Sequence, residues 1–339
     1  MHLIVYAPFA ASALLAVSGP RLAARMPPAT GTRLLLTAGL ACALTSSLSL
    51  VLLAATLIGR LPLVAAVGAW SGDRLRHADP VSPVTAKLAM LALLLLAFAV
   101  AGTTARRVRA LRRARRACAR LGPRSGRLVV LDQPVIEAFA VPAGRGRQGR
   151  IVVSTGMLRT LNAEERQVLL AHETAHLDHR HHRHRVLAAL ITAADPLLAP
   201  LPAAIHHLTE RWADEDAAAT VTDRPLAARA LARAALAARH DDRPSPRSAV
   251  LCFGRSDVPG RVRALLAGTP ARRPVIVAVL AATLTACLVS AAEAGNDTAH
   301  LFGRARHGYH ARPLGITAAT THEARHLITV LDHRTDMSR

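Results

Sequence analysis

Apolar residues gather in four long blocks of the chain, and most polar and charged residues lie between them. The blocks cover residues 3–18, 34–58, 84–103 and 275–292. A helix needs about 20 apolar residues to cross the hydrocarbon core of a bilayer, and the last three blocks approach that length. The first block is short enough for a signal peptide, but it lacks a basic n-region and a persuasive cleavage site, which favours a retained span. The pattern predicts a multi-span membrane protein.

Two further apolar stretches do not fit a simple span. The segment from Leu61 to Trp70 is too short to cross a bilayer, and we expect it to dip into the membrane interface. Residues 186–205 have the length of a span, but Asp195 and three prolines interrupt them. We therefore expect a broken helix or hairpin that returns to its starting face and rests on the membrane.

The arginines predict how the spans are oriented. Residues 19–33 contain three arginines and no acid, residues 59–83 mix arginines with acids, and residues 106–127 contain ten arginines and no acid. Basic segments stay on the cytoplasmic side of a membrane. We therefore expect the N-terminus, residues 59–83 and the C-terminal tail outside the cell, and residues 106–273 in the cytoplasm.

The basic run from Arg106 to Arg127 has two readings. A basic helix can follow nucleic-acid phosphates, but no aromatic residues interleave with these arginines, and the run directly follows a predicted span. Contact with anionic lipid headgroups explains such a run more simply. We expect lipid contact and no direct nucleic-acid binding.

Between the third and fourth apolar blocks the pattern changes to short strands and helices. The strands are predicted at residues 128–131, 135–141 and 151–154, and two later helices at residues 226–239 and 259–266.

The fold class expected from this order is mainly α, with an α+β domain inserted between the third and fourth membrane helices. The predicted regions are a membrane part with about three spans (1–105), a cytoplasmic domain (106–273), a last span (274–294) and a poorly ordered tail outside the cell (295–339).

One helix of the soluble domain carries the strongest chemical signal. Asn162 and Glu165 have the spacing of a capping box, which predicts a helix that begins at about Ala163. The helix continues into His172-Glu173-Thr174-Ala175-His176, where two imidazoles four residues apart share a face and can hold one metal ion. A carboxylate at Glu173 then lies beside the open position of that ion, where it can accept a proton from water. This spacing favours hydrolysis that depends on Zn²⁺.

A third ligand must come from elsewhere in the chain. His182 stands where some zinc peptidases place a third histidine, but His179 occupies the position at which those chains have a helix-breaking glycine, so we expect the helix to run on. Glu210 is a better candidate, and Asp214, four residues later on a predicted helix, would orient a ligand histidine. The alternative is that both acids are solvated charges on an amphipathic helix.

The remaining histidines of this region are expected at the surface or at an interface rather than on the metal. They are His179, His181, His182, His184, His206 and His207. Arg211, His206 and His207 are possible oxyanion donors, and helical geometry alone does not choose among them.

These residues resemble the BlaR/MecR-like family of bacterial membrane zinc metallopeptidases. The resemblance includes the His172–His176 motif, the segment Glu210–Asp214 and a preceding hairpin formed by residues 137–142 and 149–158. It implies a gluzincin-type domain between membrane helices, with its site facing the cytoplasm. The family's β-lactam transducers carry a penicillin-binding sensor after the last span, and no Ser-x-x-Lys motif follows Ala294 here, so β-lactam sensing is not expected.

The sequence therefore predicts a multi-pass protein of the cell membrane that acts as a zinc metalloendopeptidase on protein or peptide substrates. By resemblance, one candidate substrate is a cytoplasmic transcriptional repressor, cut in a signal-transduction pathway, and the protein itself is another through self-cleavage. Two alternatives stay open: a general quality-control peptidase for membrane proteins, and a non-enzymatic membrane signal transducer with a structural zinc site. Glu173 argues against the last, because a structural metal site has no use for a general base.

Overall fold

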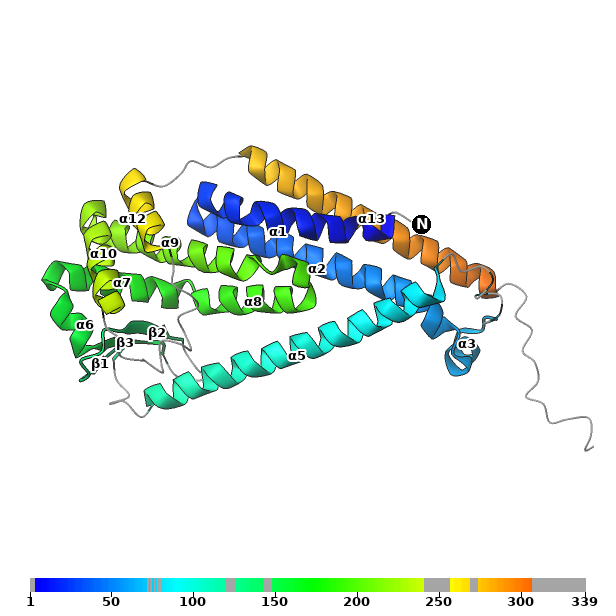
Figure 1. Ribbon diagram of the computed structural model, residues 1–339, viewed down its shortest axis with the longest axis horizontal. Helices are drawn as coiled ribbons and strands as arrows, with labels where there is room; N and C mark the ends of the chain where they lie inside the picture. The colour runs from blue at the N-terminus through cyan, green and yellow to red at the C-terminus, as the bar shows by residue number, and fades with distance from the viewer. Residues whose placement is uncertain are drawn as a thin grey trace, which may run out of the picture.

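The computed structural model describes residues 4–71, 73, 75, 77, 81–119, 126–142, 148–240, 257–268 and 274–306. The described chain is mainly helical, with one small sheet. Long helices form a bundle at one end of an elongated molecule, and shorter helices and the sheet form a domain at the other end (Figure 1).

The long helices correspond to the four apolar blocks of the sequence. They are α1 (Ala7–Arg25), preceded by the short 3-10 helix η1 (Ile4–Tyr6), α2 (Pro28–Gly59), α5 (Pro83–Ala119) and α13 (Pro274–Arg306). The short helix α3 (Pro62–Gly68) follows α2. The remaining helices are α6 (Thr155–Thr160), α7 (Ala163–Asp178), α8 (His181–Ala194), the 3-10 helix η2 (Pro196–Leu198), α9 (Leu201–Val221), α10 (Arg224–His240) and α12 (Val258–Ala267).

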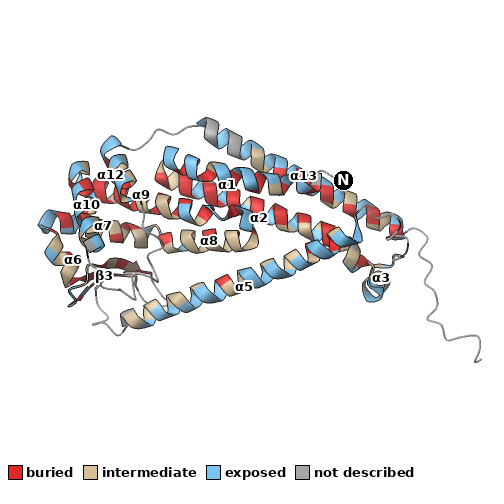
Figure 2. Ribbon diagram, viewed as in Figure 1, coloured by how far each residue is buried: buried red, intermediate tan, exposed pale blue. Residues whose placement is uncertain are grey.

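Two helices are long and apolar enough to cross a membrane by length and composition, within the part of the chain that the structure describes. They are Pro28–Gly59 and Pro83–Ala117. α5 leaves most of its surface exposed, including Leu88, Leu95 and Phe98, whereas α2 packs against α1, α5, α9 and α13 (Figure 2). A helix that exposes large apolar side chains along its length is suited to contact with lipid.

The last long helix continues beyond its predicted end. α13 extends to Arg306, so residues 295–306 are helical, and the prediction of a poorly ordered tail is wrong for them. Leu301 and Ala305 are buried against Leu75, and Phe302 makes an edge-to-face contact with Trp70. These contacts explain why the helix does not end with its apolar block. Residues 307–339 lie outside the described part of the chain.

Residues 186–205 form a hairpin, as predicted, but its apolar side chains are packed into the bundle instead of being left free to rest on a membrane surface. α8, η2 and α9 contribute Ile191, Leu198 and Ile205 to the same core as α1 and α2. At the tip, the Ser12 hydroxyl of α1 donates a hydrogen bond of 2.6 Å to Asp195. The broken segment therefore buries its polar turn against another helix.

Small residues on α2 allow this close approach. A Cβ atom added to Gly39 would lie 2.7 Å from Leu201 Cδ2, and one added to Gly31 would lie 3.0 Å from Leu208 Cδ2. α9 therefore runs against α2 from its first residues to within a turn of Glu210, which ties the position of that carboxylate to the bundle.

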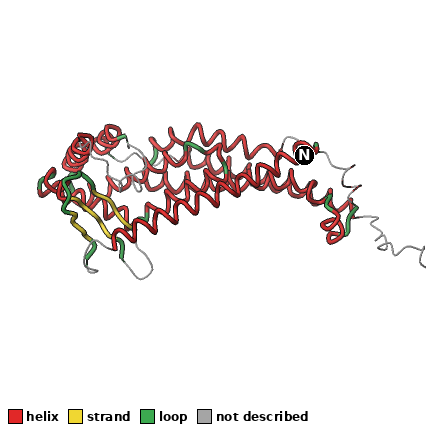
Figure 3. The backbone as a smooth tube through the Cα atoms, turned by 60° about the horizontal axis from the view of Figure 1, so that its bottom comes forward, coloured by secondary structure: helices red, strands yellow, loops and turns green. Residues whose placement is uncertain are grey.

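The sheet has three strands in the order β1-β3-β2 (Figure 3). Its strands are β1 (Leu128–Leu131), β2 (Ala138–Val141) and β3 (Arg150–Ser154). β3 pairs in parallel with β1 and antiparallel with β2, which confirms the predicted strands, although β2 begins three residues later than expected. One face of β3 packs on α6 and α7 through Ile151 and Val153. The sheet therefore supports α7 from one side.

Candidate metal centre

α7 begins with the predicted capping box. The Asn162 side chain accepts a hydrogen bond of 2.8 Å from the Glu165 amide, and the Glu165 carboxylate accepts one of 3.0 Å from the Asn162 amide. Glu165 is buried and also pairs with Arg233 of α10 at 2.8 Å. The helix then continues without a break to Asp178, so His172 and His176 lie one turn apart on one face.

Three side chains from two helices converge beside this face. His172 Nε2 and His176 Nε2 of α7 are 3.1 Å apart. Glu210 of α9 places Oε1 3.4 Å from His176 Nε2 and Oε2 3.8 Å from His172 Nε2. One ligand atom from each residue lies within 4.8 Å of the others, a grouping that can hold a metal ion. Two imidazole nitrogens and a carboxylate oxygen are a donor set that catalytic zinc sites use.

The far nitrogen of each imidazole has its own partner. His172 Nδ1 donates to Asp214 Oδ1 at 3.1 Å, and His176 Nδ1 lies 2.7 Å from His181 Nδ1. Both rings are therefore held with Nε2 toward Glu210, which leaves these nitrogens for a metal ion. Asp214 lies against the nitrogen of His172 that faces away from Glu210. His181, expected at the surface or at an interface, is instead buried beside His176.

Two arginines that the sequence did not indicate complete the polar cluster. Arg261 of α12 donates to both oxygens of Asp214, at 2.7 and 2.6 Å, and lies 3.0 Å from Glu210 Oε2. Arg185 of α8 pairs with Glu210 Oε1 at 2.5 Å. Arg261 is distant from the motif in sequence, and Arg185 is on the next helix, whose direction depends on the turn at Arg180, so no local spacing could have placed either side chain at the cluster.

Burial and charge shift the pKa values of the cluster in opposite directions. Burial raises the pKa of Glu173, which makes its carboxylate a stronger base. Burial would also raise the pKa of Glu210, but nearby Arg261, His176 and Arg185 hold it well below its usual value. Burial lowers the pKa of His176 to about 4, so this ring is neutral at physiological pH.

Glu173 lines a cavity of about 230 Å³ together with His172, Glu210, Asp214 and Arg261. The rest of the wall is mostly apolar and comes from β2, α6, α7, α10 and α12. Its apolar members include Ala138, Met157, Leu161, Ala230, Leu231, Ala234 and Leu265. The candidate base and two of the candidate ligands, His172 and Glu210, therefore line the same partly apolar space.

The chain breaks after α7, where a continuous helix was expected. Arg180 adopts a left-handed conformation with φ of 52°, and α8 begins at the next residue. This conformation is costly for a residue with a side chain. The turn brings His181 back onto His176 and stacks the ring of His179 on Trp212 at 4.4 Å between centroids. His182 still lies outside the metal-binding group.

The three candidate oxyanion donors differ in how close they lie to the cluster. Arg211 points away from the cluster, since its Nη1 donates to the carbonyl of Ala23 in α1 at 3.2 Å. His206 Nδ1 lies 4.0 Å from Glu210 Oε1 and so remains near the site. His207 adjoins Arg211, and burial lowers its pKa.

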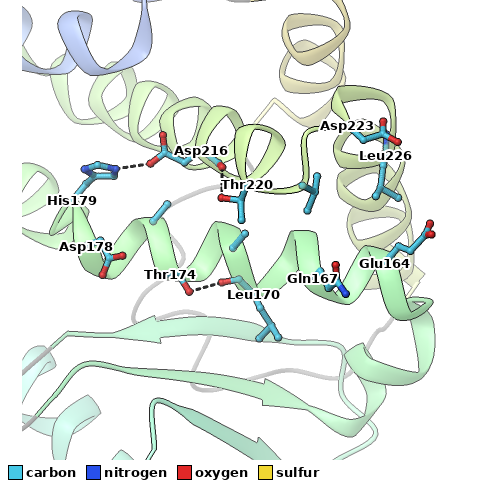
Figure 4. Close-up of a pocket in the computed structure, with 13 residues that line it drawn as sticks. Glu164, Gln167, Leu170, Thr174, Asp178, His179, Asp216, Thr220, Asp223 and Leu226 are labelled. Carbon is cyan, nitrogen blue, oxygen red and sulfur yellow. Dashed lines mark hydrogen bonds and ion pairs between the residues drawn. The ribbon is translucent and has the colours of Figure 1, made fainter.

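A larger hollow of about 810 Å³ lies on another face of α7 (Figure 4). Acidic residues Glu164, Asp178, Asp216 and Asp223 line it, and His179 pairs with Asp216 at 2.5 Å. It contains neither Glu173 nor any of the three clustered ligands. Since chemistry needs the base and the ligands together, we place the candidate active site in the smaller cavity.

Residues 103–265 match the model of peptidase family M48. The match supports the M48 metallopeptidase family. It runs from the middle of α5 to α12 and contains every residue of the cluster, from His172 to Arg261. Since M48 peptidases are metal-dependent, it indicates a metallopeptidase that acts on protein or peptide substrates. The finer BlaR/MecR-like grouping stays a prediction. No curated protein and no solved structure matches the chain significantly.

Proposed function

We propose that the protein is a membrane-bound zinc metalloendopeptidase of the gluzincin type that cuts protein substrates at the cytoplasmic face. The observation that carries this proposal is the convergence of His172, His176 and Glu210 beside a cavity that Glu173 also lines. Asp214 then acts as the partner that orients His172.

The side chains suit hydrolysis of a peptide bond. His172, His176 and Glu210 would hold Zn²⁺, which when bound polarises a carbonyl group and lowers the pKa of a water molecule. The Glu173 carboxylate accepts a proton from the attacking water and returns it to the leaving amine. Its raised pKa favours proton acceptance, and the apolar wall of the cavity limits the access of bulk water.

The small sheet offers a way to align an extended substrate. β2 pairs only with β3 in the described sheet, and Ala138 at its start lines the cavity. An edge strand can pair with a peptide backbone without demanding a particular sequence. Such pairing would draw a polypeptide past Glu173, which supports an endopeptidase.

The candidate centre lies next to the corner where α1 meets α2. The Arg211 guanidinium binds the Ala23 carbonyl, and the Arg33 guanidinium lies 5.5 Å from the centre of the Trp212 ring. Both contacts involve the two residues that directly follow Glu210 on α9. If α2 crosses the bilayer with this corner inside, as its arginines favour, substrates are cut close to the membrane surface.

This position bears on the choice of substrate. A site at the bilayer surface can reach the cytoplasmic ends of membrane proteins, which favours the quality-control alternative as a second candidate. A soluble transcriptional repressor can reach the same site by diffusion. The exposed arginines of α5, among them Arg106, Arg109 and Arg113, follow its apolar half, where they would contact anionic lipid headgroups if this helix crosses the membrane.

Substitution of the candidate base tests the proposal. The full chain in detergent should bind zinc and cleave an unfolded protein substrate. Glu173→Gln should retain zinc and lose activity by about 10²- to 10⁴-fold, because the general base is removed. Glu164→Gln, an exposed position on the same helix, is the matched control and should cleave as the wild type does. Wild-type rates from Glu173→Gln would rule out Glu173 as the general base, whereas a wild-type chain that binds zinc but cleaves nothing would favour a structural zinc site.

Substrate identity needs a second experiment. Membrane and cytoplasmic proteomes are compared between cells that make the wild-type protein and cells that make Glu173→Gln. A repressor that accumulates in the variant supports regulatory proteolysis, and accumulation of many membrane proteins supports quality control.

A further inference from the structure

The carboxylate of Glu210 contacts two guanidinium groups, one on each oxygen. Arg185 Nη2 lies 2.5 Å from Oε1, and Arg261 Nη1 lies 3.0 Å from Oε2. We propose that Arg185 competes with the metal ion for Glu210 and thereby weakens metal binding. This inference rests on the proposed function only in taking Glu210 as the third metal ligand.

The fold holds Arg185 in this position from two directions. The turn at Arg180 starts α8 so that Arg185 faces α9, and its Nε donates to Thr209 Oγ1 at 3.3 Å. The Thr209 hydroxyl is fixed in turn, since it donates to the His206 carbonyl at 2.9 Å. Arg185 is therefore bound to the residue before Glu210 as well as to Glu210 itself.

The two arginines have different roles. Arg261 is almost fully buried and binds both oxygens of Asp214 in addition to Glu210. It therefore neutralises part of the acidic cluster and supports the partner of His172. The polar contacts of Arg185 at the centre are with Glu210 and Thr209, so its charge acts directly on the third ligand.

The charges of the cluster show the direction of the effect. When ionised, Glu173, Glu210 and Asp214 contribute three negative charges, and Arg185 and Arg261 contribute two positive charges. Only one negative charge then remains to balance a divalent cation. Without Arg185, two uncompensated negative charges remain near the metal position. Glu210 still pairs with Arg261, so its carboxylate becomes a better metal ligand without becoming an unpaired buried charge.

The placement of this pair gives the hairpin a further role. Arg185 lies on α8 and Glu210 on α9, so the two arms of one hairpin carry the competitor and the ligand. Both arms pack against α2. A change in the packing of the hairpin against the bundle would therefore alter how strongly Arg185 competes for Glu210.

Zinc affinity of the purified full-length chain tests this inference. Zinc is first removed with a chelator, and the Kd is then measured by competition with a fluorescent zinc indicator at pH 7.5. Arg185→Gln should bind zinc about tenfold more tightly than the wild type, the scale on which neighbours of metal ligands act. Arg185→Met should also bind more tightly, and it provides a second neutral variant if the first does not fold.

Arg183→Gln is the matched control. Arg183 lies on the same helix, carries the same charge and is exposed, so its loss should leave the Kd unchanged. Equal or weaker zinc binding in both Arg185 variants would overturn the inference, because Arg185 would then only position Glu210. His172→Ala separates this failure from a failure of the proposed function. If His172→Ala leaves zinc binding intact, the metal site itself is wrong.

Discussion

His176 and His181 face each other through their Nδ1 atoms at 2.7 Å. If His176 uses Nε2 for a metal ion, its Nδ1–H donates and His181 Nδ1 accepts, which requires a neutral His181. Burial, followed by nearby His176 and Arg185, lowers the pKa of His181 to about 2 and keeps the ring neutral. A neutral imidazole thus takes the place that a carboxylate takes beside His172.

The exchange of His181 for phenylalanine should weaken zinc binding. His181→Phe retains a ring that can pack against Trp212, whose centroid lies 5.1 Å away, but it removes the acceptor for His176. We expect the zinc Kd to rise about 10- to 100-fold, the usual effect of removing a partner of a ligand histidine. Indicator competition measures this change. His182→Phe on the same helix is the control, and an unchanged Kd in His181→Phe would show that this contact does not orient His176.

Arg261 should stabilise the folded protein as well as the arrangement of the metal ligands. Arg261→Met leaves Asp214 without its guanidinium partner in a buried setting and takes one partner from Glu210. Loss of one partner from a buried ion pair costs about 3–5 kcal/mol of unfolding free energy. Thermal unfolding should therefore begin well below the wild-type temperature.

The neighbouring Arg263 provides the comparison for this change. Arg263 is exposed on α12, and among the described residues its Nε donates within its own helix, to the Pro259 carbonyl at 3.3 Å. Arg263→Met should unfold near the wild-type temperature. Equal effects of the two substitutions would mean that the buried pair contributes nothing specific.

The beginning of α7 could be predicted because its determinants are local. Asn162 and Glu165 are three residues apart, and their reciprocal hydrogen bonds require no other part of the chain. The spacing of His172 and His176 is likewise a property of one helix. That Glu210 lies beside His172 and His176 could be expected only from its chemistry, because the packing of α9 on α7 brings the three side chains together.

The parts that sequence reasoning missed depend on tertiary contacts. Arg180 adopts a left-handed conformation that its residue type disfavours, and the packing of His181 on His176 and Trp212 accompanies this turn. Arg185 and Arg261 reach the cluster from other helices. Likewise, α13 continues to Arg306 because Leu301 and Phe302 find partners in residues near Trp70. None of these contacts has a pattern that a local reading detects.

The capping box should contribute a measurable part of the stability of α7. Asn162→Ala removes the acceptor for the Glu165 amide, and loss of such a cap costs about 1 kcal/mol of unfolding free energy. Thermal unfolding and hydrogen exchange of the first turn of α7 both report on this change. Glu164→Ala alters an exposed neighbour in the same turn and should have a smaller effect. If the two variants unfold alike, the cap does not stabilise the helix in the intact protein.

Zinc binding should weaken as the pH falls, and His172 sets the direction of the change. Burial lowers the pKa of His172, but the hydrogen bond to Asp214 and the charges of Asp214, Glu210 and Glu173 raise it more, so the net pKa lies above the usual value. A proton on this ring competes with zinc for Nε2. The raised pKa means that the proton stays bound to a higher pH than on an ordinary histidine, so zinc is lost progressively as the pH falls through that pKa.

Asp214→Asn tests whether protonation of His172 causes the loss of zinc at low pH. The amide carries no charge, so the pKa of His172 falls and zinc should be retained to a lower pH than in the wild type, measured by metal content after equilibration at each pH. At a pH high enough for zinc binding to no longer depend on pH in either protein, the variant should bind zinc more weakly, because an amide orients the imidazole less firmly than a carboxylate does. If the variant loses zinc at the same pH as the wild type, the competing proton binds to a group other than His172.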